Sequence, residues 1–213
     1  LFSERIIIMR ILLLPLIITI LAWVLKHNAD KRDHTDKHSV RSYLDRESAA
    51  NSVRRQDISA LPYIQAPVES FPFDITLNDP KKQLQIDDYK KEILSCAKRP
   101  MLNLTGISNT ELKEAYGPAN LDILSTYDQN YSMYTRNLFL YAQTIYEEYP
   151  AEAAHMLEYC IQEGTDISGI YALLGQYYQS QGNRTALSRL YDSIPDADSI
   201  SGKMIRNKLD QLK

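Results

Sequence analysis

The sequence is poor in the residues that build chemical sites. It has two cysteines, Cys96 and Cys160, and neither belongs to a CxxC pair or has a histidine at metal-ligand spacing. We interpret both as buried thiols that act as small apolar residues, with a single disulfide as the alternative. The chain also lacks GxSxG, HExxH, a Walker loop and a glycine-rich nucleotide turn. We therefore predict no catalytic residues, no cofactor and no metal site.

A large charge of one sign is also missing. The formal net charge is −3, which gives no electrostatic argument for a nucleic-acid partner. The charge is unevenly distributed, because residues 26–60 carry eight Lys/Arg and six Asp/Glu, whereas residues 101–213 carry eight and fourteen. The part predicted to fold is therefore acidic, and the part before it is mildly basic.

A long apolar run occurs at the beginning of the chain. Residues 11–25 carry no charge, and the run resumes before Arg10. Fifteen residues are fewer than the roughly 20 that a spanning helix needs. The long side chains of Arg10 and Lys26 extend the usable length, and Trp23 lies where an interfacial ring belongs. We predict that residues 1–25 are an uncleaved, single-pass membrane anchor.

The alternative to an uncleaved anchor is a cleaved signal peptide. For a cut after Ala29, His27 would occupy the position that requires a small residue. Lys and Arg are more numerous on the carboxyl side of the apolar run, which predicts a cytoplasmic helical domain at the cell membrane. Export of that domain is the open alternative. The start of the protein is either Leu1 or Met9.

Residues 26–78 are predicted to be a flexible polar linker. They lack sustained apolar periodicity, and the stretch LPYIQAPVESFPFD contributes three prolines. Part of the linker, between Val40 and Arg55, could form a short helix. His34 and His38 have an i, i+4 spacing that can hold a metal. Because no apolar face holds this segment in place, we interpret it as a solvated tether.

From residue 79 the chain is predicted to be helical. Apolar residues return at three- and four-residue steps, and no strand-like alternation follows residue 80. The expected helices cover residues 87–99, 108–117, 119–149, 150–164, 166–182, 184–194 and 199–212. The third is either one long helix or two helices joined by a break near residues 129–132.

An internal repeat organises this helical region. When the chain is shifted by 32 residues, Phe139 aligns with Tyr171, Tyr146 with Tyr178, Pro150 with Gly182, Ala154 with Ala186, and Tyr159 with Tyr191. A period of 20–50 residues is typical of stacked helical hairpins. In such a unit an aromatic side chain fills the space between two helices and a small residue allows them to approach. Gly175 is therefore predicted to serve close helix packing.

The second unit resembles the tetratricopeptide repeat. The family pattern is followed by Tyr171, Leu174, Gly175, Tyr178, Gly182, Ala186 and Tyr191, while the first unit has Gln143 in place of the glycine. The resemblance covers about residues 137–195. It implies an all-α fold, in which a short tetratricopeptide-like array of helical hairpins carries a C-terminal capping helix. In the predicted chain, residues 79–213 form this array, behind a single transmembrane helix and a disordered tether.

The resemblance also implies a peptide groove lined by the first helix of each hairpin. The matching positions are Asn137, Leu140, Thr144, Glu147 and Glu148 in the first unit, and Ala172, Gln176, Gln179 and Ser180 in the second. None is Lys or Arg, so capture of a C-terminal carboxylate is disfavoured, and we expect a neutral or basic protein or peptide partner. The alternative is that these residues form a solvated face.

The tyrosines require an interpretation of their own. Twelve of the fifteen lie between Tyr116 and Tyr191. We expect them to pack helices together rather than to form a surface that stacks sugars or bases. The function predicted from the sequence is a membrane-anchored scaffold or adaptor that binds a protein partner. The alternative is an exported structural or assembly protein of the cell envelope.

Overall fold

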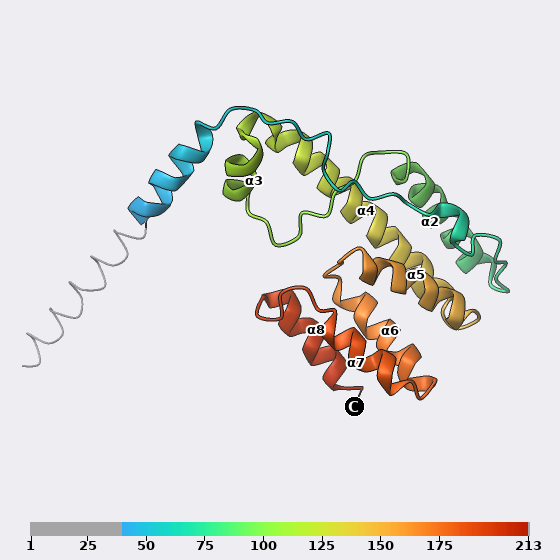
Figure 1. Ribbon diagram of the computed structural model, residues 1–213. Coiled ribbons are helices and arrows are strands. Elements are labelled where there is room, and N and C mark those ends of the chain that lie inside the picture. The colour runs from blue at the N-terminus through green and yellow to red at the C-terminus, as the bar shows by residue number, and fades with distance from the viewer. Residues whose placement is uncertain (1–39, 213) are drawn as a thin grey trace, which may run out of the picture. The chain divides into compact units, whose positions relative to one another are not determined.

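The computed structural model describes residues 40–212. Within that range every regular element is a helix (Figure 1). The described chain divides into two compact units, one ending at Val53 and the other beginning at Arg54. Residues 40–51 of the first unit are helical, which agrees with the short helix expected between Val40 and Arg55. The remainder of the fold belongs to the second unit.

The second unit is built from helices joined by short connections. Its α-helices are α2 (Pro80–Cys96), α3 (Asn109–Tyr116), α4 (Leu121–Ile145), α5 (Pro150–Gln162), α6 (Ser168–Ser180), α7 (Arg184–Asp192) and α8 (Ile200–Asp210), with 3-10 turns η1 (Val68–Ser70) and η2 (Pro118–Asn120). The long helix expected over residues 119–149 is a single unbroken helix, α4, which ends at Ile145.

Local signals in the sequence explain several helix ends. Ser108 and Glu111 form a reciprocal capping box at the start of α3. Gly117 ends α3 with a positive φ of 81°, and a Cβ there would lie 2.7 Å from the carbonyl oxygen of Arg54. The residue before α6 is Ile167, one residue later than the expected helix start at residue 166, and no side chain caps this helix.

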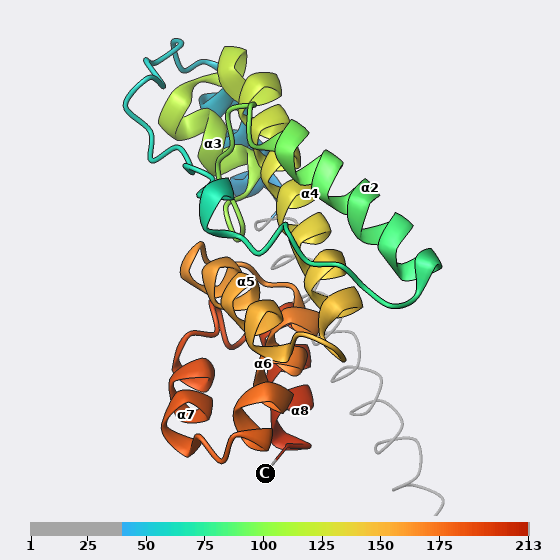
Figure 2. The ribbon, with the colours of Figure 1, turned by 90° about the vertical axis from the view of Figure 1, so that its right-hand side faces the viewer.

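Helix α4 is the centre of the unit. Helix α2 runs antiparallel along it, because Lys82 near the start of α2 bonds to Glu147 just beyond α4, while Asn130 within α4 donates to the carbonyl of Pro100, which follows α2. Helix α5 packs on α4, α6 packs on α5, and both α7 and α8 pack on α6 (Figures 1 and 2). Consecutive pairs α4–α5 and α6–α7 therefore form two packed hairpins.

The core contains tyrosine as well as aliphatic side chains. Tyr134, Tyr141 and Tyr171 are among the largest fully buried side chains. All twelve tyrosines between Tyr116 and Tyr191 are buried or half-buried. The prediction that these tyrosines pack helices together is confirmed.

Gly175 has the packing role expected for it, with an additional partner. A Cβ at this position would lie 2.7 Å from Leu212 Cδ1 and 2.9 Å from Leu209 Cδ2, but 3.7 Å from Leu187 Cδ1. The tightest approach at Gly175 is therefore to Leu209 in α8 and to Leu212 just beyond it, rather than to α7. The sequence repeat pointed to α7 because it compares hairpins and contains no information about the helix that packs across them.

The chain before α2 is ordered on the helical unit over residues 54–78, a segment we call the strap. Phe71 is buried, with its ring centroid 5.3 Å from that of Tyr159. The ring of Phe73 lies 5.4 Å from that of Tyr141 in an edge-on arrangement. These aromatic contacts make the strap part of the hydrophobic core.

Helix side chains also bind the backbone of the strap. Tyr141 donates its hydroxyl to the carbonyl of Pro72 at 3.0 Å, and Lys90 Nζ donates to the carbonyl of Phe73 at 2.9 Å. Tyr149 donates to the carbonyl of Thr76 at 3.1 Å. These three bonds hold the extended backbone of the strap against the helices without the formation of a strand.

The predicted fold class is wrong as a whole, because it placed a transmembrane helix and a disordered tether before the array. Among the residues that the structure describes, no helix is both long and apolar enough to cross a membrane. The longest of them, α4, has 25 residues, but polar side chains such as Asp122, Asn130 and Arg136 recur along it. The predicted anchor, residues 1–25, lies outside the described residues, and so do His34 and His38.

The prediction of a disordered tether is wrong for residues 54–78, and the reason is physical. Its polar and proline-containing sequence has no helical or strand periodicity, which is the usual sign of a flexible linker. The strap is nevertheless fixed, because Phe71 and Leu77 are buried against helices that follow them in the chain. Periodicity reports only local structure, so it could not detect these contacts.

Candidate functional site

The two predicted groove helices lie next to each other at one crossing point. A Cβ on Gly169, at the start of α6, would lie 2.5 Å from Cζ of Phe139 in α4. Only a glycine allows this approach of the two helices. Helices α4 and α6 are in contact at this point, and we call the outward-facing residues of the two helices the α4–α6 face.

The predicted residues fall on that face. Those from α4 are half-buried, namely Asn137, Leu140 and Thr144, and their three- and four-residue spacing aligns them along one side of the helix. Those from α6 are the half-buried Ala172 and the exposed Gln176, Gln179 and Ser180. The sequence positions therefore identify outward-facing residues on both helices.

Both predicted acidic residues are already bonded within the chain. Lys82 Nζ lies 2.6 Å from Glu147 Oε2, and Asn78 donates to Glu148 Oε2 at 2.8 Å. The hydrogen bond from Lys82 lowers the pKa of Glu147, and the same bond raises the pKa of Lys82. Lys82 therefore offsets the charge of Glu147, whereas Glu148 is hydrogen-bonded by a neutral amide and keeps its charge.

Polar side chains at the other end of the face also form hydrogen bonds within the chain. Gln179 Nε2 donates to the carbonyl of Leu212 at 2.6 Å, and Ser180 Oγ donates to the carbonyl of Tyr177 at 2.7 Å. The amide of Asn137 and the hydroxyl of Thr144 donate to carbonyls of their own helix. The middle of the face, from Leu140 to Gln176, has the least polar bonding to other elements.

Two residues of the face were missed by sequence reasoning. Met133 is 44% exposed, and Arg136 is exposed one turn further along α4. The positions transferred from the repeat family begin at Asn137, so both residues fell outside the match. Their spacing from Leu140 would have identified them, since 133, 136 and 140 share one helix side.

The described residues contain few groups suited to chemistry. Cys96 and Cys160 are buried free thiols, and burial raises the pKa of each, so that both stay protonated near neutral pH. His155 is exposed on α5. Within residues 40–212, no group of three or more His, Cys, Asp or Glu side chains could hold a metal ion.

The described chain is an all-helical protein whose helices pack against one another, which is compatible with a helical repeat. Comparison of the sequence and structure with protein-family models, curated proteins and solved structures gives no match.

Proposed function

We propose that this protein is a scaffold or adaptor that binds a segment of a protein partner on the α4–α6 face. The observation that supports the proposal is the contact between α4 and α6 at Phe139 and Gly169, which makes the two predicted groove helices neighbours. The α4–α6 face combines the apolar Leu140 with the polar Thr144 and Gln176, a mixture typical of protein interfaces.

We also propose that the two hairpins are degenerate tetratricopeptide units. Ala154 is buried within α5, where a small residue lets α5 approach α4. Tyr171 is buried and donates its hydroxyl to the carbonyls of Thr165 and Ser193. These bonds connect the residues before α6 with the end of α7. In arrays of this kind the first helices of successive hairpins line the surface that binds partners.

The partner segment that fits this face is neutral. The sequence predicted a neutral or basic partner because none of the groove positions is Lys or Arg, but Lys82 forms an ion pair with Glu147. The guanidinium of Arg136 lies on the same side of α4 and repels a basic segment. Amide-bearing and apolar side chains complement Gln176 and Leu140 without a charge.

The proposal is tested by site-specific photo-crosslinking of the full chain in the cells that produce it. A benzoylphenylalanine replaces Thr144, Gln176 or, as a control, the exposed Glu152 on α5. We expect one discrete cross-linked product from positions 144 and 176, and none from position 152. The same product should disappear when Ala172→Trp is introduced, because the indole would occupy the middle of the face.

Equal cross-linking from all three positions would contradict the proposal, and so would a product that survives Ala172→Trp. Since Ala172 is half-buried, the thermal transition of the variant is compared with that of the parent chain. Gln176→Lys provides a second variant at a fully exposed position, and it should weaken the same product without changing stability.

A further inference from the structure

A second surface lies between the second helices of the two hairpins. Helices α5 and α7 both pack on α6, and the space between them is a cleft of about 490 Å³. We call it the α5–α7 cleft. Its volume is within the range of about 300–1,000 Å³ that is usual for ligand pockets. None of the nine residues predicted for the groove lines this cleft.

The floor of the cleft is apolar. Ile161 comes from α5, Leu174 from α6 and Leu190 from α7, so each of the three helices contributes one aliphatic side chain. Leu174 and Leu190 are buried, and Ile161 is half-buried. A ligand that enters the cleft therefore needs an apolar group to contact this floor.

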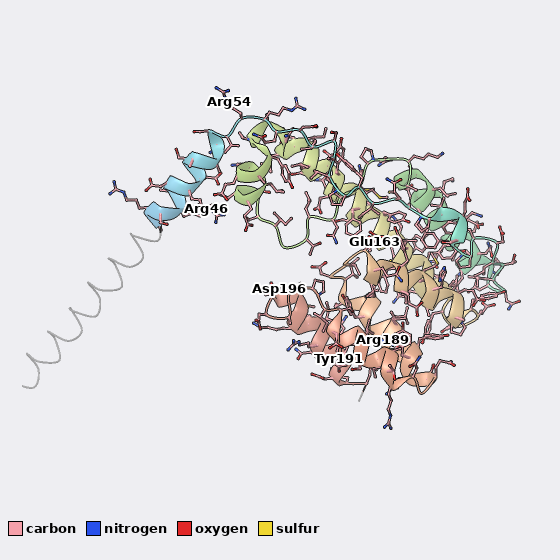
Figure 3. The ribbon with its side chains drawn as sticks, in the orientation of Figure 1. Arg46, Arg54, Glu163, Arg189, Tyr191 and Asp196 are labelled. Atoms are coloured by element: carbon pink, nitrogen blue, oxygen red, sulfur yellow. The ribbon has the colours of Figure 1, made fainter. Side chains whose placement is uncertain are left out.

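One wall of the cleft carries an available cation. Arg189, labelled on α7 in Figure 3, lines the cleft and is exposed. Its side chain has no hydrogen-bond or ion-pair partner within residues 40–212. A guanidinium offers a fork of N–H donors that matches a carboxylate. This wall therefore favours a ligand with a carboxylate.

A second arginine extends the same positive region. An adjoining hollow of about 350 Å³ shares Tyr178 and Asn183 with the cleft and is lined by Arg184. The preceding stretch, residues 137–183, has six Asp/Glu and no Lys or Arg. Arg184 and Arg189 are thus the first cations after a long acidic stretch, and both line this connected groove.

The opposite wall carries an oriented acceptor. Tyr178 donates its hydroxyl to Glu158 Oε1 at 2.7 Å, which holds the carboxylate at the rim of the cleft. The second carboxylate oxygen of Glu158 accepts no hydrogen bond from residues 40–212. Burial raises the pKa of Tyr178, and the neighbouring Glu158 raises it further, so the phenol stays a donor. A free acceptor on this wall suits a backbone N–H of a ligand.

We propose that the α5–α7 cleft binds a short peptide segment that carries an acidic side chain beside a large apolar one. The apolar side chain packs on Ile161, Leu174 and Leu190. The carboxylate binds the guanidinium of Arg189, and a peptide N–H donates to Glu158. This site shares α6 with the α4–α6 face, but none of the nine residues predicted for the groove lines it, and it takes a ligand of different charge.

The test uses the full 213-residue chain and three fluorescent peptides with blocked termini. The central tripeptides are Leu-Glu-Leu, Leu-Gln-Leu and Leu-Lys-Leu, and binding is followed by fluorescence anisotropy at low salt. We expect the glutamate peptide to bind at least about tenfold more tightly than the glutamine peptide, since a charge-assisted bidentate bond is lost. The lysine peptide should bind most weakly.

Variants of the chain locate the binding. Arg189→Gln should remove the preference for the glutamate peptide, whereas Arg189→Lys should keep part of it. Ala186→Trp should block the cleft, because Ala186 lines it. The matched control is Ala172→Trp, which places the same side chain on α6 outside the cleft and should leave peptide binding unchanged.

Three results would overturn the assignment. They are equal binding of the three peptides, no binding at millimolar peptide, and unchanged binding by a folded Ala186→Trp chain. Because Ala186 is half-buried, Arg189→Gln at an exposed position gives an independent test if the tryptophan variant unfolds. Failure of this site leaves the cross-linking from Gln176 unaffected, so the two proposals fail separately.

Discussion

The two hairpins of this protein have the same topology but differ in how completely they are buried. Helices α4 and α5 contain nine and five buried residues, whereas α6 and α7 contain four and one. The first hairpin is covered by α2, by the strap and by α6, while the second has α8 on one side and an open cleft on another. The same repeat unit is therefore a core element in one copy and a surface element in the other.

Equivalent tyrosines illustrate the difference. Tyr159 in α5 contacts Phe71 and Tyr134 within the core. Its counterpart Tyr191 in α7 directs its hydroxyl to Asp210 at 2.9 Å near the end of α8. The aromatic position is retained, but it holds the strap in one hairpin and the last helix in the other. We infer that stability is concentrated in the first hairpin and that the second is freer to present binding surfaces.

The largest predicted effect compares one buried side chain from each region. Phe71→Ala should lower the free energy of unfolding by about 4 kcal/mol, because a buried ring leaves a cavity under the strap. Leu190→Ala should cost about 2 kcal/mol, at the lower end of the usual range, since the cleft already adjoins that residue.

Urea unfolding of both variants measures this difference. Losses of equal size would remove the contrast between the hairpins. A loss of less than about 1 kcal/mol for Phe71→Ala would show that the strap is dispensable for the folded state.

A smaller effect is predicted where the second hairpin meets α8. Gly175→Ala would bring a methyl group to within 2.7 Å of Leu212 Cδ1 and 2.9 Å of Leu209 Cδ2. Overpacking should outweigh the gain in helix propensity and leave a net loss of about 1 kcal/mol. Gln176→Ala, at the exposed neighbouring position, is the control and should not destabilise the chain. A stabilised Gly175→Ala chain would mean that α8 does not pack closely on α6.

The core of the first hairpin contains buried hydroxyl groups that can be removed by substitution. The hydroxyls of Tyr134 and Tyr159 are buried, and neither has a hydrogen-bond partner among the described residues. Burial raises the pKa of both phenols, so both remain neutral. Tyr134→Phe should therefore raise the free energy of unfolding by up to about 1 kcal/mol. A loss of stability in thermal unfolding would reveal a bond to this hydroxyl.

The smallest predicted effect concerns pH. Burial raises the pKa of Glu163, labelled in Figure 3 beyond the end of α5, above its usual 4.5. The stability that this carboxyl contributes is therefore complete below pH 4.5 and is lost as the pH rises through the raised pKa. Glu163→Gln should be slightly more stable than the parent chain at pH 7, with no difference in acid.

Thermal unfolding of both chains from pH 4 to pH 8 measures this trend. Glu92→Gln, which removes an exposed carboxylate from α2, should show no such dependence. A stability difference that stays constant with pH would mean that the carboxyl of Glu163 is not desolvated.

Local signals in the sequence were sufficient for much of the helical region. Gly117, Gly164 and Gly182 each follow a helix with positive φ, and each is the last residue of a helix range expected from the sequence. The capping box at Ser108 and the proline at the start of α5 are equally local, whereas α2 begins at Pro80, seven residues before the helix expected over residues 87–99. Such signals depend on a few neighbouring residues, so one sequence is enough to recognise them.

Contacts between distant residues were beyond the same reasoning. Nothing near Phe71 indicates that Tyr159 receives its ring, and nothing near Glu147 indicates that Lys82 neutralises it. The α5–α7 cleft depends on how two helices are spaced, and nothing in the sequence near Arg189 indicates that this residue lines a cleft. The sequence pattern predicted outward-facing residues on α4 and α6, but not that Gln179 and Glu147 are bonded within the chain, and the partner site itself stays a prediction.

The measurement that tests the central claim most directly is a calorimetric titration of the full chain with the protein captured by cross-linking at Gln176. The parent chain is compared with Ala172→Trp and Ala186→Trp, two substitutions of half-buried alanines on neighbouring helices. A scaffold that uses the α4–α6 face predicts at least about tenfold weaker binding by Ala172→Trp, and unchanged binding by Ala186→Trp. Weakening by Ala186→Trp alone would contradict that claim and move the partner to the α5–α7 cleft.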